Sequence, residues 1–187
     1  PEWHEYKKRA SELSTDFLNK QQGKILDLGS GSGRHLMKIK NSKMYLVDFS
    51  KDMIALAEKK AKEQNIDAEF AVSEMTKLPY EDNFFDSGIS ISSIHCTPKK
   101  DHKKIVKELH RVLKPKAKFL VGVWNKNSKR FKRYKENERY ISWQDKGKRY
   151  YYLFTENEIH DLFIGAGFKI IQEQNSELMI RFVVEKV

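Results

Sequence analysis

Three glycines at alternate positions, in Asp27-Leu28-Gly29-Ser30-Gly31-Ser32-Gly33, are the residues whose spacing most clearly predicts chemistry. They follow the apolar run Ile25–Leu28, which is typical of a buried strand. Glycine accepts positive φ angles and lacks a Cβ, so ligand atoms can approach the backbone closely at such a turn. The dinucleotide fingerprint G-x-G-x-x-G requires a glycine at position 34, where the chain has Arg34. We therefore expect a nucleotide cofactor other than a dinucleotide; the alternative is a glycine-rich turn with no ligand.

Acidic residues stand near the ends of the next two predicted strands. Asp48 ends the segment Met44–Asp48, and Glu74 comes shortly after Ala68–Val72. In a doubly wound sheet the ligand lies beyond the carboxyl ends of the strands. A carboxylate at position 48 is therefore placed to accept hydrogen bonds from both ribose hydroxyls of a nucleoside. The alternative is that Asp48 is only a favourable charge before the helix predicted from Ser50.

The pattern D-x-G-x-G-x-G resembles motif I of the class I S-adenosylmethionine-dependent methyltransferases. The resemblance implies that S-adenosylmethionine is the cofactor and that Asp27 helps to hold its methionine amino group. The segment Ser73–Tyr80 resembles the G-D-A-x-x-L-P-F segment of the same superfamily, which implies that Glu74 reads the adenine amino group and that Met75 lies against the ring. The complete set of expected cofactor residues is Asp27, Gly29, Gly31, Gly33, Asp48, Phe49, Glu74, Met75 and Ser90.

The elements that position these residues alternate between strands and helices. We expect strands over residues 24–28, 44–48, 68–72, 87–92, 118–124, 169–174 and 178–185, and helices over 2–20, 32–40, 50–64, 103–113 and from Thr155 onward. This order predicts an α/β, Rossmann-like, doubly wound sheet of seven mostly parallel strands that ends in an antiparallel hairpin. We expect a single domain over 1–187, with an N-terminal helical segment (1–22) and a basic, aromatic insertion on the substrate side (125–152).

Composition limits the class of protein. The chain has 187 residues, 39% of them hydrophobic, and no apolar run approaches the ~18 residues of a membrane span. The first residues lack the pattern of a signal peptide, so we expect a cytoplasmic protein without membrane association. The single Cys96 cannot form an internal disulfide, and no Cys/His spacing predicts a metal site.

The positive charge is regional. The chain carries a net charge of +10, yet residues 97–150 alone hold 19 Lys and Arg against five Asp and Glu. The rest of the chain is therefore mildly acidic. A basic region on a cofactor-binding domain favours a polyanionic substrate on that side, although a lysine-rich surface also serves solubility alone.

A closer resemblance covers most of residues 24–187. The run Phe85–Cys96, the Val-Trp at 123–124 and the segment Arg149–Phe154 are similar to the wobble-uridine tRNA methyltransferase family, which includes the methyltransferase domain of AlkB-homologue proteins. That family methylates the carboxylate of 5-carboxymethyluridine in the anticodon. Such a carboxylate is already ionised at neutral pH, so alignment with the methyl group can supply most of the rate. The resemblance implies tRNA as the substrate and His95 as the catalytic residue.

The basic, aromatic insertion supplies the expected substrate contacts. Cations suit the phosphates of a single-stranded loop, and aromatic rings suit its splayed bases. The residues that we expect to bind substrate are Trp124, Asn125, Arg130, Arg133, Arg149 and Tyr150. By analogy with the family, a small zinc-binding activator protein would dock on the strand 68–72, which we expect at the sheet edge.

Two other functions remain compatible with the sequence. A small-molecule methyltransferase would have the same glycine loop, the same Asp48 and the same Leu-Pro segment at 78–79. A non-catalytic RNA-binding protein could retain the fold without the reaction.

Overall fold

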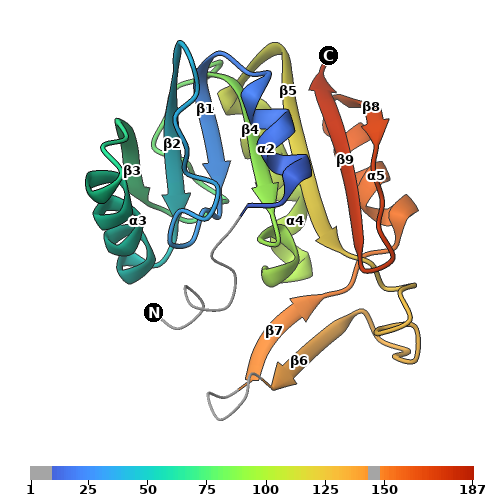
Figure 1. Cartoon of the computed structure of the whole chain (residues 1–187). Helices are drawn as coiled ribbons and strands as arrows, with labels where there is room; N and C mark the ends of the chain where they lie inside the picture. The colour runs from blue at the N-terminus through green and yellow to red at the C-terminus, as the bar shows by residue number, and fades with distance from the viewer. Residues whose placement is uncertain (1–9, 143–147) are drawn as a thin grey trace.

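The computed structural model describes residues 10–142 and 148–187. Its centre is a seven-stranded sheet in the order β3-β2-β1-β4-β5-β9-β8 (Figure 1). The strands are β1 (Gly23–Leu28), β2 (Ser42–Asp48), β3 (Ala68–Val72), β4 (Phe85–Ile91), β5 (Leu113–Trp124), β8 (Phe168–Glu173) and β9 (Met179–Lys186). Neighbours among β1 to β5 pair in parallel, and β9 is antiparallel to both β5 and β8. The predicted sheet and its terminal hairpin are confirmed.

Helices cover both faces of the sheet. They are α2 (Glu12–Asn19), α3 (Lys51–Glu63), α4 (Lys99–Val112) and α5 (Glu156–Ile164), together with the short 3₁₀ helix η1 (Ile94–Cys96). Residues of α4 and α5, such as Leu109 and Phe163, join one buried apolar cluster. Residues of α2 and α3, such as Leu18 and Ala57, join a second cluster. The predicted cap of α3 is present, since the Ser50 hydroxyl accepts a hydrogen bond from the Met53 N–H at 3.3 Å.

The helix expected over residues 32–40 does not form. Turns follow the glycine loop as far as Arg34 and His35, and an irregular segment leads into β2. Gly33 has φ +74°, outside the range of a right-handed helix, so a helix cannot run through this residue. The residues between Gly33 and the start of β2 at Ser42 form turns and irregular backbone instead. Leu36 and Ile39 still enter the core, with exposures of 5% and 9%. Apolar spacing alone thus predicted their burial correctly but their backbone wrongly.

The N-terminal helical segment expected over 1–22 is represented by α2, and residues 1–9 lie outside the described part of the chain. Within the described residues, none of the helices is both long and apolar enough to cross a membrane.

The basic, aromatic insertion contains a hairpin of its own. Strands β6 (Glu138–Ser142) and β7 (Lys148–Tyr152) pair antiparallel, and the hairpin lies beyond the carboxyl ends of the parallel strands (Figure 1). Its base is anchored by the buried side chains of Phe131, Tyr151 and Leu153. The described part of the insertion predicted over 125–152 therefore contains a hairpin beyond the carboxyl ends of the parallel strands.

Candidate functional site

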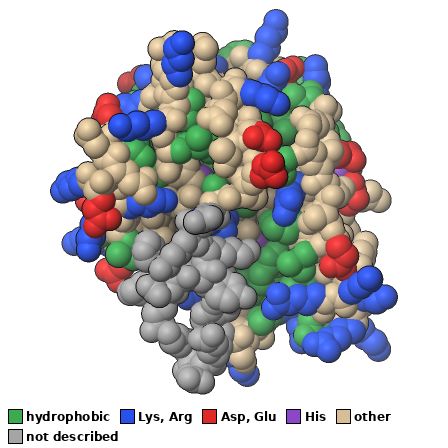
Figure 2. All heavy atoms as spheres, viewed as in Figure 1, with side chains coloured by type: hydrophobic (Ala, Val, Ile, Leu, Met, Phe, Trp, Pro, Cys, Tyr) green, Lys and Arg blue, Asp and Glu red, His purple; other side chains and the backbone are tan. Residues whose placement is uncertain are grey.

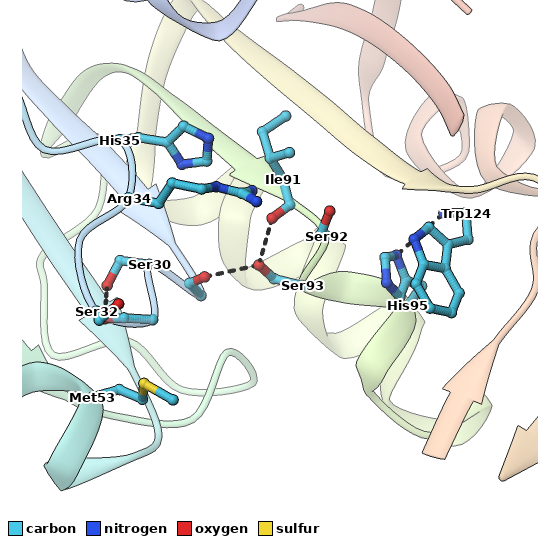
Figure 3. A pocket seen from close by; sticks show the side chains of 12 residues that line it. Ser30, Ser32, Arg34, His35, Met53, Ile91, Ser92, Ser93, His95 and Trp124 are labelled. Atoms are coloured by element: carbon cyan, nitrogen blue, oxygen red, sulfur yellow. Dashed lines mark hydrogen bonds between the residues drawn. The ribbon is translucent and has the colours of Figure 1, made fainter. Parts of the chain in front are cut away.

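A pocket opens between the glycine loop, the end of β4 and the end of β5 (Figure 3). Two predicted groups meet in it, because Gly29 and Gly31 line one side while His95 and Trp124 line the other. The complete lining is Gly29, Ser30, Gly31, Ser32, Arg34, His35, Met53, Ile91, Ser92, Ser93, His95 and Trp124. The topology explains this meeting, since the carboxyl ends of β1 and β4 lie side by side in the sheet.

The glycines are required by space as well as by backbone angle. Gly29, Gly31 and Gly33 all have positive φ angles. A Cβ on Gly29 would lie 2.4 Å from the Ser93 Cβ and 2.5 Å from the Met75 Cε, so the loop packs directly on these residues. A Cβ on Gly31 would meet no atom within 4 Å, although Gly31 lines the pocket. The backbone at Gly31 therefore faces open space that a ligand can enter.

Asp27 presents an unused oxygen near this loop. It is the penultimate residue of β1 and is 1% exposed. Its Oδ2 lies 3.6 Å from the His35 Nδ1, yet it has no hydrogen-bond partner in the described structure. A buried carboxylate oxygen without a donor is costly. This oxygen is suited to a cationic or N–H group, although Asp27 itself is not among the residues that line the pocket.

Asp48 holds the loop from the end of β2. Its two oxygens accept hydrogen bonds from the backbone N–H groups of Gly31 and Ser50, each at 2.9 Å. Burial raises the pKa of Asp48, and the two backbone N–H groups partly oppose this effect. Each carboxylate oxygen has a second lone pair, so the predicted bonds to ribose hydroxyls stay compatible with these contacts.

Three of the expected cofactor residues, Phe49, Glu74 and Met75, lie outside the pocket lining. Phe49 is 78% exposed, so its ring is available as a stacking surface. Met75 contacts the loop beneath Gly29. Glu74 is exposed, and its Oε2 accepts a hydrogen bond from the Thr76 hydroxyl at 3.3 Å. The roles of these three residues stay predictions.

Of the serines at the end of β4, which were expected to line the site from Ser90 to Ser93, only Ser92 and Ser93 line the pocket. Ser90 is fully buried, lies outside the pocket lining and donates its hydroxyl to the Leu28 carbonyl at 2.9 Å. Ser92 and Ser93 line the pocket instead. Ser92 has φ +63° and a buried hydroxyl oxygen without a partner in the described structure. The chain leaves the strand at this residue, which turns the two serines toward the ligand side.

His95 and Trp124 form the wall opposite the loop. The His95 Nδ1 accepts a hydrogen bond from the Trp124 backbone N–H at 3.2 Å, so the proton of the neutral imidazole is on Nε2. The two rings stack with centroids 4.9 Å apart. Trp124 also stacks on Tyr151 at 4.4 Å and on Phe131 at 4.9 Å. This layered cluster gives the pocket a flat aromatic side.

The other expected substrate residues lie around the hairpin, outside the pocket lining. Arg130 lies 5.4 Å from the Trp124 ring centroid, and the exposed Arg133 donates to the Tyr134 hydroxyl at 3.0 Å. The Asn125 Oδ1 accepts from the Asn127 N–H at 2.9 Å, which ties this side chain into a local turn. Arg149 and Tyr150 are half-buried on β7, and the ring of Tyr150 packs against the exposed Tyr140.

Sequence reasoning missed several pocket residues, including Arg34, His35 and Met53. Arg34 and His35 were assigned to a helix that does not form. Their position directly after the last glycine was the available signal. Met53 lies in the first turn of α3, inside the helix that was predicted over 50–64.

Comparisons with known proteins agree with this geometry. Residues 19–158 match a family described as a methyltransferase domain. The chain belongs to this family. A crystal structure of S-adenosylmethionine-dependent methyltransferases from Methanosarcina mazei superposes with a TM-score of 0.80 at 23% identity, and the match covers 96% of this chain and 99% of the other. This methyltransferase therefore has the class I fold, and the predicted cofactor class is confirmed at the level of family and fold.

Two further relatives have names that state a function. A ubiquinone/menaquinone biosynthesis C-methyltransferase from Rickettsia felis is 36% identical over 106 residues, which are 51% of this chain and 42% of the relative. The match thus spans less than half the length of that relative. The second is a 1,6-didemethyltoxoflavin N1-methyltransferase from Burkholderia thailandensis, solved with bound 1,6-didemethyltoxoflavin and S-adenosylhomocysteine. It superposes with a TM-score of 0.73 at 17% identity, and the match covers 94% of this chain and 77% of the Burkholderia chain.

Proposed function

We propose that this methyltransferase transfers a methyl group from S-adenosylmethionine to a small, planar molecule held against His95 and Trp124. The observation that carries the proposal is that the glycine loop and these two rings line the same pocket. The curated relative acts in quinone biosynthesis by name, and the Burkholderia protein acts on a small heterocycle. Both relatives support the small-molecule alternative better than a tRNA substrate.

The residues present fit the cofactor. Its sulfonium supplies an electrophilic methyl group when it is bound. The unpartnered Oδ2 of Asp27 suits the amino group of the methionine part, and the open space at Gly31 accommodates ligand atoms beside the backbone. Asp48 is placed for the ribose hydroxyls because it already contacts the loop at Gly31.

On the acceptor side, His95 orients rather than deprotonates. Its Nδ1 lone pair is occupied by the Trp124 N–H, so the ring does not offer that nitrogen as a base. Trp124 is 8% exposed and is held by aromatic neighbours on its faces, so it forms a rigid wall. A fixed wall increases the rate through alignment.

Methyl transfer from radiolabelled S-adenosylmethionine tests the proposal. The purified chain is incubated separately with a panel of hydroxylated quinone and phenol precursors and with total tRNA. We expect label in the organic extract and little label in the RNA. Label confined to tRNA would contradict the small-molecule substrate while leaving the methyltransferase assignment intact.

A second candidate is the wobble-uridine tRNA methyltransferase, and the charge around the hairpin favours it. Lys and Arg side chains gather on the lower right of the face in Figure 2, where Figure 1 places the segment between β5 and β6. Arg139 and Arg133 lie 4.0 Å and 5.0 Å from the Tyr134 ring centroid, an arrangement that suits phosphates next to stacked bases. We propose residues 125–152 as this substrate-side insertion.

Two measurements test the tRNA candidate. Binding through several phosphates would weaken steeply with salt, so we expect tight tRNA binding at 50 mM salt that is lost at about 200 mM if this candidate is right. A methyl ester of 5-carboxymethyluridine would release its label in mild alkali. Weak, salt-insensitive binding would exclude the tRNA candidate, and alkali-resistant label would exclude the ester.

The activator protein belongs to this second candidate. β3 is an edge strand of the sheet, as expected, and Val72 on it is 53% exposed. We propose this edge as the docking strand, which a co-purification of the tagged chain with and without Val72→Pro would test. A proline there removes an edge N–H, and unchanged co-purification of a small zinc protein would contradict docking at this edge.

A further inference from the structure

Arg34 is a charged residue of the pocket lining. It follows Gly33, and its side chain extends from the glycine loop into the pocket (Figure 3). A guanidinium carries five N–H donors and stays ionised in proteins. Among residues 10–142 and 148–187, the structure gives Arg34 no hydrogen-bond acceptor. Partial burial lowers its pKa, and the opposing charge that raises the pKa is Asp27.

The surroundings of Arg34 define which ligand would satisfy it. Arg34 is the one Lys or Arg among the described residues that line the pocket. Lys60 of α3, a cation that reaches the same loop, donates instead to the Gly33 carbonyl. Any anionic group that enters the loop side of the pocket therefore meets the guanidinium of Arg34.

Asp27 provides the opposite charge beside it. Its Oδ2 is buried without a hydrogen-bond partner in the described structure, and the adjacent His35 has an equally unpartnered Nε2. An unsatisfied carboxylate and an unsatisfied guanidinium thus flank the same loop. Their charges complement an α-amino acid, in which an ammonium and a carboxylate are attached to one carbon atom.

We propose that Arg34 binds the α-carboxylate of the methionine part of the cofactor and selects ligands that carry this group. The inference rests on the proposed function, since it assumes that S-adenosylmethionine occupies the pocket. It adds a residue that the fingerprint of three glycines does not contain. A bidentate pair between guanidinium and carboxylate is among the stronger interactions of this kind and has a defined geometry.

Calorimetric titration with two probes tests the assignment. One probe is S-adenosylhomocysteine, and the other is its decarboxylated analogue, which keeps the nucleoside and the amine. We expect Arg34→Met to weaken binding of S-adenosylhomocysteine by about 10- to 100-fold, from the range for a hydrogen bond to a charged group. Binding of the decarboxylated analogue should change less than about threefold, because it lacks the partner of Arg34.

Two further variants complete the design. Lys38→Met removes an exposed cation from the same segment and should leave both affinities unchanged. Arg34→Lys keeps the positive charge but lacks the planar guanidinium group. It should lose less affinity for S-adenosylhomocysteine than Arg34→Met does, and the affinity for the decarboxylated analogue should again change less. This variant decides the test if Arg34→Met does not fold.

The outcomes distinguish a failure of the role of Arg34 from a failure of the proposed function. Equal losses for both probes, or no loss for either, would overturn the role of Arg34. Failure of the unsubstituted protein to bind either probe would instead overturn the proposed function. Selective loss of S-adenosylhomocysteine binding is the one pattern that supports the assignment.

Discussion

Replacing Asp48 by asparagine should damage both the loop and the cofactor site. The carboxylate is 9% exposed and accepts backbone N–H bonds from Gly31 and Ser50, each at 2.9 Å. Asparagine has nearly the same shape but only one acceptor oxygen. Its amide N–H₂ would therefore face one of the two backbone donors, and that N–H would lose its partner.

The magnitude follows from these two bonds. An unsatisfied buried N–H costs about 1–3 kcal/mol, and the bond that remains changes from charge-assisted to neutral at a cost of about 1 kcal/mol. Removal of a buried charge offsets part of this loss, because burial raises the pKa of Asp48 and so disfavours its ionised form. We expect Asp48→Asn to lower the free energy of unfolding by about 1–3 kcal/mol. Binding of S-adenosylhomocysteine should weaken at least about tenfold.

The sign of the pH dependence is also defined. Since the folded pKa of Asp48 lies above its ordinary value, the folded state retains this proton longer than the unfolded state. The contribution of this group to stability is therefore greatest below the ordinary pKa of aspartate and declines as the pH rises through the raised pKa. The asparagine variant lacks this decline.

Urea unfolding and calorimetric titration, with Asp52→Asn as the control, provide the assay. Asp52 is exposed in the first turn of α3, so its replacement should cost less than about 0.5 kcal/mol. Unchanged cofactor affinity in a folded Asp48→Asn protein would refute the ribose role. Unchanged unfolding would refute the account of the two backbone bonds.

Three further substitutions have defined outcomes. Lys60→Met removes the side-chain donor to the Gly33 carbonyl and should weaken S-adenosylhomocysteine binding about three- to tenfold by calorimetry, whereas Lys59→Met, which is 73% exposed, should not. Trp124→Ala should lower the free energy of unfolding in urea by about 3–5 kcal/mol because three ring contacts are lost, and a loss below 1 kcal/mol would contradict the rigid wall. Ser92→Gly should be more stable to heat than Ser92→Ala by about 0.5–1 kcal/mol, because both variants remove the buried hydroxyl and only glycine relieves φ +63°.

Most of the fold could be predicted because its signals are local. Apolar runs of strand length and caps such as Ser50 and Thr155 depend on neighbouring residues, and alternation of strands and helices then restricts the topology. The same local reasoning failed at residues 32–40. There, the spacing of Leu36 and Ile39 satisfied a helical pattern, but the positive φ angle of Gly33 interrupts the helix and the residues after it form turns and irregular backbone.

The sequence predicted a nucleoside cofactor for the candidate site, but it did not predict all of the residues that line the pocket. The glycine spacing, Asp27 and Asp48 indicated a nucleoside cofactor, and the family match agrees. Ser90 was assigned to the pocket because it lies near the end of β4. Its hydroxyl instead bonds to Leu28 on the adjacent strand, while the left-handed backbone at Ser92 brings the following serines to the pocket.

The sequence by itself determined the class of fold and the position of the cofactor loop, because strand periodicity and the conformational freedom of glycine act within a few residues. Only the tertiary structure decided which side chains share the pocket. The His95 ring is fixed by a backbone N–H that lies 29 residues away, and Asp48 holds Gly31 across 17 residues. Arg34 lost its predicted helix because the backbone at the preceding Gly33 has a positive φ angle, and its side chain lines a pocket that residues at the ends of β4 and β5 complete.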